Sequence, residues 1–195
     1  MAKESKPQEP TPYQIDYRNV EYPRLEFKTG SLLLVLPRNY ENEMKIIEKH
    51  KDWIHKKEQI IRRALEEAKE KDLILTRTDE ELKNQVHSIV ERYQQEFNIN
   101  IHRIYFKKMK TKWGSYSSKN NLTINTLLKY LPERLIHYII FHELAHSREK
   151  RHNERFWKII RKKFEDYQTK EKNLLAYWFL VQKHNSSVNE SFREI

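Results

Sequence analysis

The chain has 195 residues, of which 37% are hydrophobic and 34% are charged. This composition supports a folded core in one domain or two and excludes wholesale disorder. With two glycines and no cysteine, it excludes glycine-rich phosphate loops, disulfides and cysteine-ligated metals. A bound metal would therefore need His, Asp or Glu ligands. The longest aliphatic run, residues 32–36, is too short to cross a bilayer, and the N-terminus lacks the apolar segment of a signal peptide, so we expect a cytoplasmic protein.

The net charge of +10 is concentrated in one part of the chain. Residues 101–163 contain 16 Lys and Arg but only 4 Asp and Glu, a net charge of +12, which leaves a net charge of −2 for all other residues. A Lys- and Glu-rich solvated surface explains the flanking parts. The acid-poor block 101–163 instead favours a surface that faces DNA or another polyanion, and both interpretations stay open here.

The first half of the chain begins with a polar segment, residues 1–12, which contains three of the six prolines and predicts a flexible tail. Short β-favouring runs over residues 13–37 then predict a small antiparallel β-meander. Apolar residues at helical spacing over residues 40–71 predict one long helix or two close ones. Asp79 is expected to be the N-cap of a further helix that ends near Phe97.

The second half of the chain alternates strand and helix patterns. Predicted strands at residues 103–109, 112–116 and 122–125 include a hairpin with a turn at Asn120 and Asn121. Pro132 suits the first turn of a strongly apolar helix that reaches about Ser147, and we expect this helix to be central. Asn153 is expected to cap the next helix, and a last helix is predicted over about residues 170–182.

The apolar helix contains the motif HExxH, His142-Glu143-Leu144-Ala145-His146. Residues four apart lie on one face of a helix, so both imidazoles can reach one ion, and the intervening Glu can reach a metal-bound water. His142 and His146 are therefore candidate zinc ligands, and Glu143 is the candidate general base. The alternative is a pair of buried core histidines, which would leave several polar groups unpaired in one place.

A third candidate ligand, His152, follows His146 by six residues, where a chain reversal after the helix can return it to the metal. The other histidines have no ligand spacing, and His137 lies off the ligand face. The His spacing also equals that of metzincins, but Glu149 stands where those enzymes need a glycine for a tight turn, which argues against that clan.

Several motifs in order make the chain resemble the YgjP-like metallopeptidases and, more distantly, the SprT-like (Spartan-type) proteases that act on protein crosslinked to DNA. These are a WGS sequence at Trp113–Ser115, Ile124-Asn125 at a strand end, the HELAH helix, and an H-N-x-x-F-W segment from His152 to Trp157. The resemblance implies a zincin-type peptidase with His142, His146 and His152 as zinc ligands and Glu143 as base. Tyr116 departs from the family pattern, which usually has Cys after WGS.

We therefore expect an α+β, zincin-like fold: an N-terminal antiparallel β-meander and a helical catalytic unit with a central HExxH helix. The expected divisions are a tail at 1–12, meander and helices at 13–100, a catalytic unit at 101–184 and a tail at 185–195, with 13–184 forming one compact unit. The expected function is zinc-dependent peptide hydrolysis with one Zn²⁺ per chain, acting on a peptide or protein substrate and associated with nucleic acid through the block 101–163.

Two other functions remain open at this point. A metal-activated water could attack a phosphoanhydride, as in a nucleotide pyrophosphatase, with the basic block holding the phosphates. The chain could instead be a nucleic-acid-binding module with a non-catalytic metal, in which aromatic residues such as Tyr105, Phe106, Trp113 and Tyr116 stack on bases. Aromatic residues in strands are, however, more often part of a core.

Overall fold

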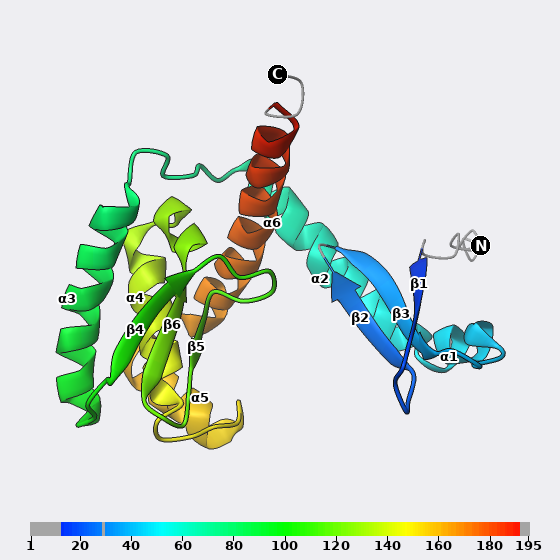
Figure 1. Cartoon of the computed structure of the whole chain (residues 1–195), viewed down its shortest axis with the longest axis horizontal. Helices are drawn as coiled ribbons and strands as arrows, with labels where there is room; N and C mark the ends of the chain where they lie inside the picture. Colours follow the sequence, from blue (N-terminus) through cyan, green and yellow to red (C-terminus); the bar gives the residue numbers. More distant parts are fainter. Residues whose placement is uncertain (1–12, 29, 192–195) are drawn as a thin grey trace, which may run out of the picture. The chain divides into compact units, whose positions relative to one another are not determined.

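The computed structural model describes residues 13–28 and 30–191, and its backbone divides into two compact units, Met1–Arg63 and Ala64–Ile195 (Figure 1). The sequence-based division between residues 100 and 101 differs from this one. It assigned the helix that precedes residue 100 to the N-terminal strands, whereas that helix packs in the second unit. The predicted tail 1–12 lies outside the described residues.

The first unit contains a three-stranded sheet of β1 (Tyr13–Arg18), β2 (Arg24–Lys28) and β3 (Ser31–Pro37). The expected strands are present, but the predicted antiparallel meander is wrong, because β3 lies between the other two and runs parallel to β1 and antiparallel to β2. Residues Leu32 to Leu36 are at most 8% exposed. A strand that is apolar on both faces is best buried when a neighbour covers each edge, which explains its central position.

The helical part of this unit starts with α1 (Glu43–Lys49), and α2 (Lys51–Lys69) follows after a break at His50 and crosses the boundary between the units. Asn42 caps α1 by accepting a hydrogen bond from the Lys45 amide at 3.2 Å. Ile46 and Ile54 pack with the apolar residues of β3. The two close helices agree with one of the two arrangements that the spacing predicted.

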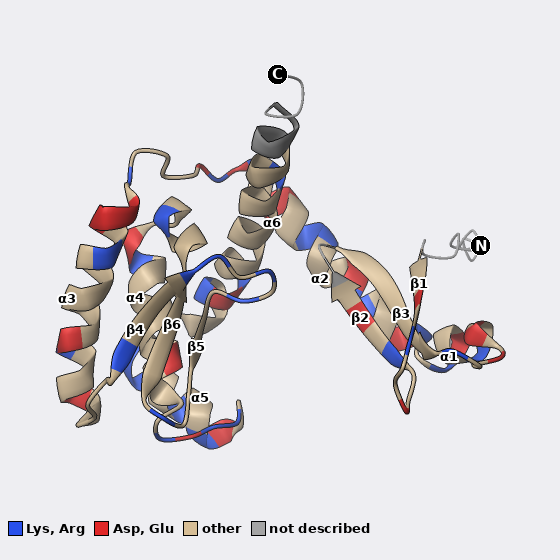
Figure 2. Cartoon of the chain, in the orientation of Figure 1, with Lys and Arg blue, Asp and Glu red and all other residues tan. Residues whose placement is uncertain are grey.

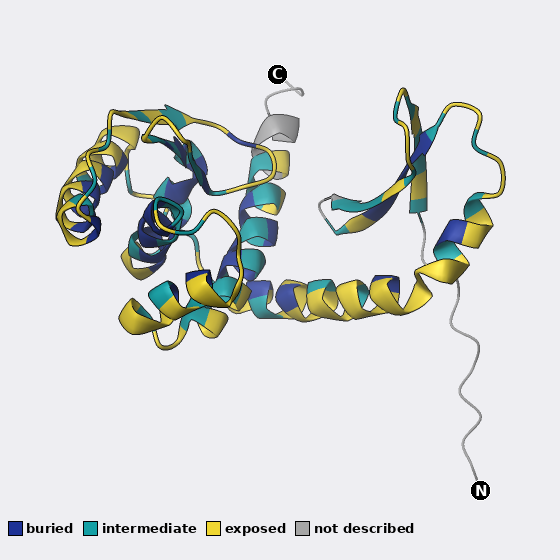
Figure 3. Cartoon of the chain, turned by 90° about the horizontal axis from the view of Figure 1, so that it is seen from below, coloured by how far each residue is buried: buried dark blue, intermediate teal, exposed yellow. Residues whose placement is uncertain are grey.

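Besides the end of α2, the described part of the second unit combines three strands with four α-helices and a short 3₁₀ helix. Its elements are α3 (Asp79–Phe97), β4 (Arg103–Lys107), β5 (Gly114–Tyr116), β6 (Asn121–Asn125), η1 (Thr126–Tyr130), α4 (Glu133–Ala145), α5 (Glu154–Lys163) and α6 (Tyr167–Ser191). β5 and β6 form the predicted hairpin, and β4 joins the sheet parallel to β6, giving the order β4-β6-β5. One face of this sheet packs on α3 and α4 through Ile104, Phe106, Leu122 and Ile124 (Figure 3).

The N-cap of α3 lies one residue earlier than the sequence predicted. Thr78, not Asp79, is the N-cap: its hydroxyl accepts a hydrogen bond from the Glu81 amide at 3.1 Å, and the Glu81 carboxylate accepts one from the Thr78 amide at 2.7 Å. This reciprocal pair is a capping box, which satisfies two backbone amides where a single Asp cap would satisfy fewer. Asp79 is the first helical residue instead.

Helix α4 supplies much of the core of the second unit. Eight of its 13 residues are buried, and it contacts α3, β5, α5 and α6. Helix α6 is longer than predicted and continues to Ser191, so the expected tail 185–195 is helical over most of its length; residues 192–195 lie outside the described part. None of the helices within residues 13–28 and 30–191 has the length and apolar composition needed to cross a membrane.

The loop between β4 and β5 is held by one buried polar side chain, Asn125, which is 0% exposed. Its Nδ2 donates to the carbonyls of Met109 at 3.0 Å and Lys112 at 2.8 Å. Its Oδ1 accepts from the amides of Met109 at 3.3 Å and Leu127 at 3.1 Å. Asn125 thereby fixes the segment that leads into β5 and also starts η1.

Replacing Asn125 with Ala should lower the free energy of unfolding by about 2–4 kcal/mol, because buried carbonyl and amide groups lose their partners. Urea denaturation followed by circular dichroism measures this change. Asn100→Ala, at an exposed position of the same unit, is the matched control. A loss for Asn125→Ala no greater than that of the control would show that the loop does not depend on this side chain.

Candidate metal centre

Two of the predicted ligands lie at the C-terminal end of α4. His142 is in its last turn and His146 is its C-cap, with φ −64° and ψ −12°, so the helical spacing extends through both residues. The imidazole centroids are 5.4 Å apart. The buried residues of the same helix fix the direction of this turn and thereby the position of both rings.

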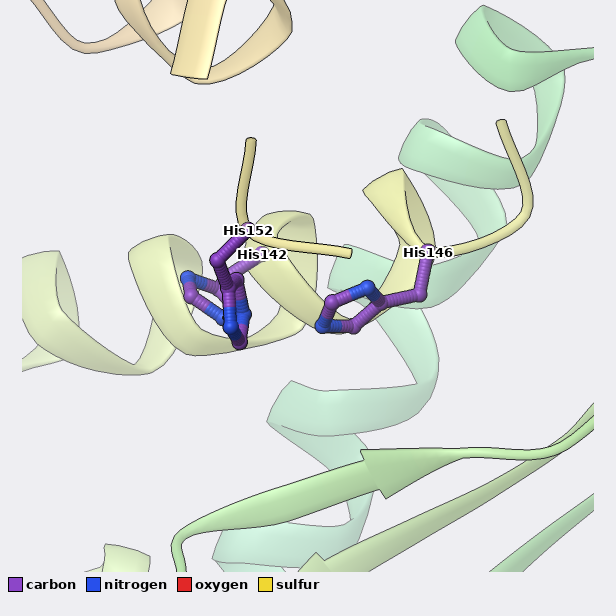
Figure 4. Close-up of side chains that lie close together, drawn as sticks. All are labelled: His142, His146 and His152. Carbon is purple, nitrogen blue, oxygen red and sulfur yellow. The ribbon is translucent and has the colours of Figure 1, made fainter. Parts of the chain in front are cut away.

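The third predicted ligand, His152, comes from the loop between α4 and α5. Its Nε2 lies 3.0 Å from His142 Nε2, and one nitrogen from each of the three rings lies within 4.8 Å of the others (Figure 4). The chain reverses between the two helices: the amide of Arg151 donates to the Glu149 carboxylate at 3.1 Å, and Asn153 caps α5 as predicted. Glu149 thus stabilises the turn at the position where metzincins have glycine.

An apolar floor supports the three rings. Phe156 of α5 is fully buried, and its ring centroid lies 4.7–4.9 Å from those of His142, His146 and His152. Trp157 stacks on His152 with ring centroids 5.7 Å apart, and its indole N–H donates a hydrogen bond to the His152 carbonyl at 3.1 Å. Phe156 and Trp157, the F-W pair of the sequence, therefore hold the imidazoles in place.

The surroundings favour the neutral form of two imidazoles, the form that binds metal ions. Burial is the largest effect on the pKa of His146 and of His152 and lowers both. His146 Nδ1 lies 3.0 Å from the Glu149 carbonyl oxygen, a distance at which Nδ1–H donates and leaves the Nε2 lone pair for an ion. The donor set of three imidazoles fits a divalent metal ion.

The structure adds two residues to the site that the sequence did not indicate, Glu171 of α6 and Tyr138 of α4. Glu171 Oε1 lies 3.5 Å from His142 Nδ1 and accepts a hydrogen bond from the Tyr138 hydroxyl at 2.5 Å. Burial favours a higher pKa for Glu171, but hydrogen bonds from His142 and Tyr138 outweigh burial and lower it. The ionised carboxylate therefore orients the His142 ring so that Nε2 points at His152.

The predicted base, Glu143, lies against β5. A Cβ atom at Gly114 would come within 2.8 Å of Glu143 Cγ, so this glycine is required for the carboxylate to approach the strand. Burial raises the pKa of Glu143, while His142, the Tyr116 backbone amide and Lys112 act in the opposite direction. The glycine of the WGS sequence thus has a specific role: it makes room for the carboxylate.

These groups open into a cleft of about 580 Å³. One wall is formed by β5 and the turn that follows it, and the other by the histidines and Glu143; Lys112 and Lys150 also line it. β5 is an edge strand, with β6 on one side. Trp113, which precedes β5, packs edge-on against Trp178 with ring centroids 4.9 Å apart. It therefore packs against the core and does not line the cleft. His137 bonds to the Tyr93 hydroxyl at 3.2 Å, away from the three rings.

The comparison with known families supports the peptidase function that the motifs predicted. The model of the YgjP-like, metallopeptidase domain matches residues 59–177, more than half of the chain. The chain belongs to the YgjP-like metallopeptidase family. It is a metal-dependent peptidase, as the motifs predicted, and the family implies a divalent metal that the three histidines could hold. The matched region includes all candidate ligands, Glu143 and Glu171.

Solved structures similar to this YgjP-like chain include two metallopeptidase zymogens. Jannalysin of Methanocaldococcus jannaschii is 34% identical over 46% of this chain and 85% of its own, with a TM-score of 0.41. Abylysin of Pyrococcus abyssi is 23% identical over 45% of this chain and 87% of its own, with a TM-score of 0.39. No curated protein matches the chain.

Gly114→Ala should reduce peptidase turnover of this YgjP-like enzyme about 100-fold, because the added methyl group displaces the Glu143 side chain. Metal affinity should stay within a few-fold of wild type, since the three atoms nearest to the added methyl group all belong to Glu143. Turnover of a quenched-fluorescent peptide mixture and calorimetric zinc titration measure the two effects. Thr111→Ala, at a nearby exposed position, is the control; equal turnover of the two variants would contradict the role of Gly114.

Glu171→Gln should weaken zinc binding about 10- to 100-fold, because the neutral amide no longer supports the basicity and orientation of His142. Zinc affinity measured by competition with a chromophoric chelator reports this change directly. Glu165→Gln, which removes an exposed carboxylate from the segment before α6, is the matched control. Unchanged affinity in Glu171→Gln would mean that the carboxylate does not position the ring.

Proposed function

We propose that this metallopeptidase uses zinc, held by His142, His146 and His152, and that Glu143 is its general base. The observation that carries the proposal is the convergence of three imidazoles beside the carboxylate of Glu143 in one cleft. Three nitrogen ligands with an open position are typical of catalytic zinc. A zinc ion bound there would lower the pKa of a water molecule and polarise the carbonyl of the scissile bond.

The chain's own residues supply the remaining steps. Glu143 accepts the proton of the attacking water and delivers it to the nitrogen of the leaving amine, a transfer that requires a carboxylate beside the metal ligands. Gly114 and the Tyr116 amide hold this carboxylate at the strand. Glu171 holds His142 in the orientation that exposes Nε2.

The edge of β5 supports an extended peptide as the substrate. Only β6 pairs with β5 among the described strands, and residues 114–118 form the cleft wall opposite the histidines. A substrate that adds to this edge as a further strand would present its backbone carbonyl to the metal site. Main-chain pairing of this kind gives affinity with little dependence on side chains.

Hydrolysis of a phosphoanhydride is a second candidate, favoured by one observation: the side chains of Lys112 and Lys150 line the cleft. Two cations beside a metal can bind a polyphosphate. We favour peptide hydrolysis because the edge strand suits a polypeptide and the family is one of peptidases. Release of pyrophosphate or phosphate from nucleoside triphosphates, lost in a Lys112→Gln and Lys150→Gln double variant, would support the second candidate.

Glu143→Gln should keep zinc and lose turnover by about 10²- to 10⁴-fold, because the amide cannot accept the proton. His152→Ala should instead lose zinc affinity and turnover together, because one of three ligands is missing. Elemental analysis after dialysis and a peptide cleavage assay separate the two effects. The neighbouring surface variant Arg155→Ala is the control for changes in folding.

Two results would contradict the assignment. Glu143→Gln with full activity would remove Glu143 as the base. His152→Ala with unchanged zinc content would remove His152 from the ligand set and leave His142 and His146 to bind the ion with a different third group.

A further inference from the structure

The sheet of the second unit has a second face that the described helices of this unit do not cover. Ile104 and Phe106 of β4 point into the core, so Arg103, Tyr105 and Lys107 alternate to the opposite face. All three are exposed, Tyr105 at 43%. The sheet lies on one side of α3 and α4, and both views show the other face of its strands open (Figures 1 and 3).

This face belongs to a segment without negative charge. Residues 97–132, from the last residue of α3 through β4, β5, β6 and η1 to the start of α4, contain seven Lys and Arg and no Asp or Glu. Figure 2 shows Lys and Arg on β4 and along the loop that follows it. No ion pair to Arg103, Lys107 or Lys119 is formed within the described part of the chain. These three cations are therefore available to an anionic partner.

The exposed tyrosine lies among these cations. Tyr105 is in register with Thr123 of β6, whose small side chain leaves the ring uncovered on that side. A hollow of about 390 Å³ next to it is lined by Tyr105, Arg103, Lys119, His102 and Asn121. Of the four aromatic residues that the sequence suggested for stacking, Phe106 and Trp113 pack on the core and Tyr116 is half-buried beside Glu143, which leaves Tyr105.

We propose that this face, centred on Tyr105, Arg103 and Lys119, binds single-stranded nucleic acid. An uncovered aromatic ring offers a stacking surface for an unpaired base, and cations on either side contact the phosphates. Double-stranded DNA would engage the cations but cannot offer its bases to a flat ring. An acidic polypeptide would also pair with the cations, but its carboxylates have no use for the aromatic ring.

The proposal is independent of the proposed catalytic mechanism. The residues of this face and those that line the metal cleft are different, so nucleic-acid binding would survive even if the zinc or base assignment failed. The charge of residues 101–163 predicted a broad surface for a polyanion. The proposed binding surface is smaller, one face of one sheet.

The test is fluorescence anisotropy of the full chain with labelled oligothymidylate. Tyr105→Ala should weaken binding about five- to 100-fold, the effect of losing one stacked base, whereas Tyr105→Phe should bind as wild type does. Tyr17→Ala is the matched control, since Tyr17 is an exposed strand tyrosine of the other sheet, at 49%. Arg103→Gln with Lys119→Gln should reduce the slope of log affinity against log salt by roughly 1.4, or about 0.7 for each lost phosphate contact.

Several results would overturn the proposal. These are no binding of oligothymidylate at low salt, Tyr105→Ala affinity equal to that of Tyr17→Ala, and binding of duplex as tight as of the single strand. Displacement of the oligonucleotide by polyglutamate that also depends on Tyr105 would assign the face to acidic polypeptides instead. Circular dichroism of each variant verifies the fold.

Discussion

The site depends on the packing of the end of α4. The apolar residues of this helix are held on several sides by α3, β5, α5 and α6, so the direction of its last turn is fixed by the core. That turn bears His142 and Glu143, and the cap bears His146. Polar groups placed there emerge from a rigid element rather than from a loop, which is the arrangement that a metal site needs for precise ligand geometry.

Three further groups fix what the helix alone does not: the position of the rings, the tautomer of His146 and the orientation of His142. Phe156 packs against the rings, the Glu149 carbonyl determines which nitrogen of His146 bears hydrogen, and Glu171 orients His142. Asn125 acts at longer range: it anchors the loop before β5 through three hydrogen bonds, and β5 in turn holds Glu143 through Gly114. The buried asparagine and the glycine therefore connect the sheet to the carboxylate of Glu143.

Much of the site could be predicted from the sequence because its signals are local. His142, Glu143 and His146 follow helical spacing, and His152 follows after a short reversal, so one segment contains them all. Glu171 and Tyr138 gave no such signal, since their contact depends on how α6 packs on α4. The pairing of β1 with β3 was also missed: the meander assumed that neighbours in sequence pair, although the five consecutive buried residues of β3 are a pattern typical of a central strand. The predicted N-cap of α3 was one residue too late, because Thr78 and Asp79 are both good caps and only the position of Glu81 distinguishes them.

We propose that three imidazoles, and no carboxylate, hold one zinc ion. X-ray absorption spectroscopy at the zinc edge, on purified protein whose metal content has been determined, tests this ligand set. We expect about one zinc per chain with three imidazole nitrogens at about 2.0–2.1 Å and one water-derived oxygen. A spectrum with fewer than three imidazoles and a carboxylate from Glu171 or Glu143 in the first shell would contradict it, as would a protein that binds no zinc.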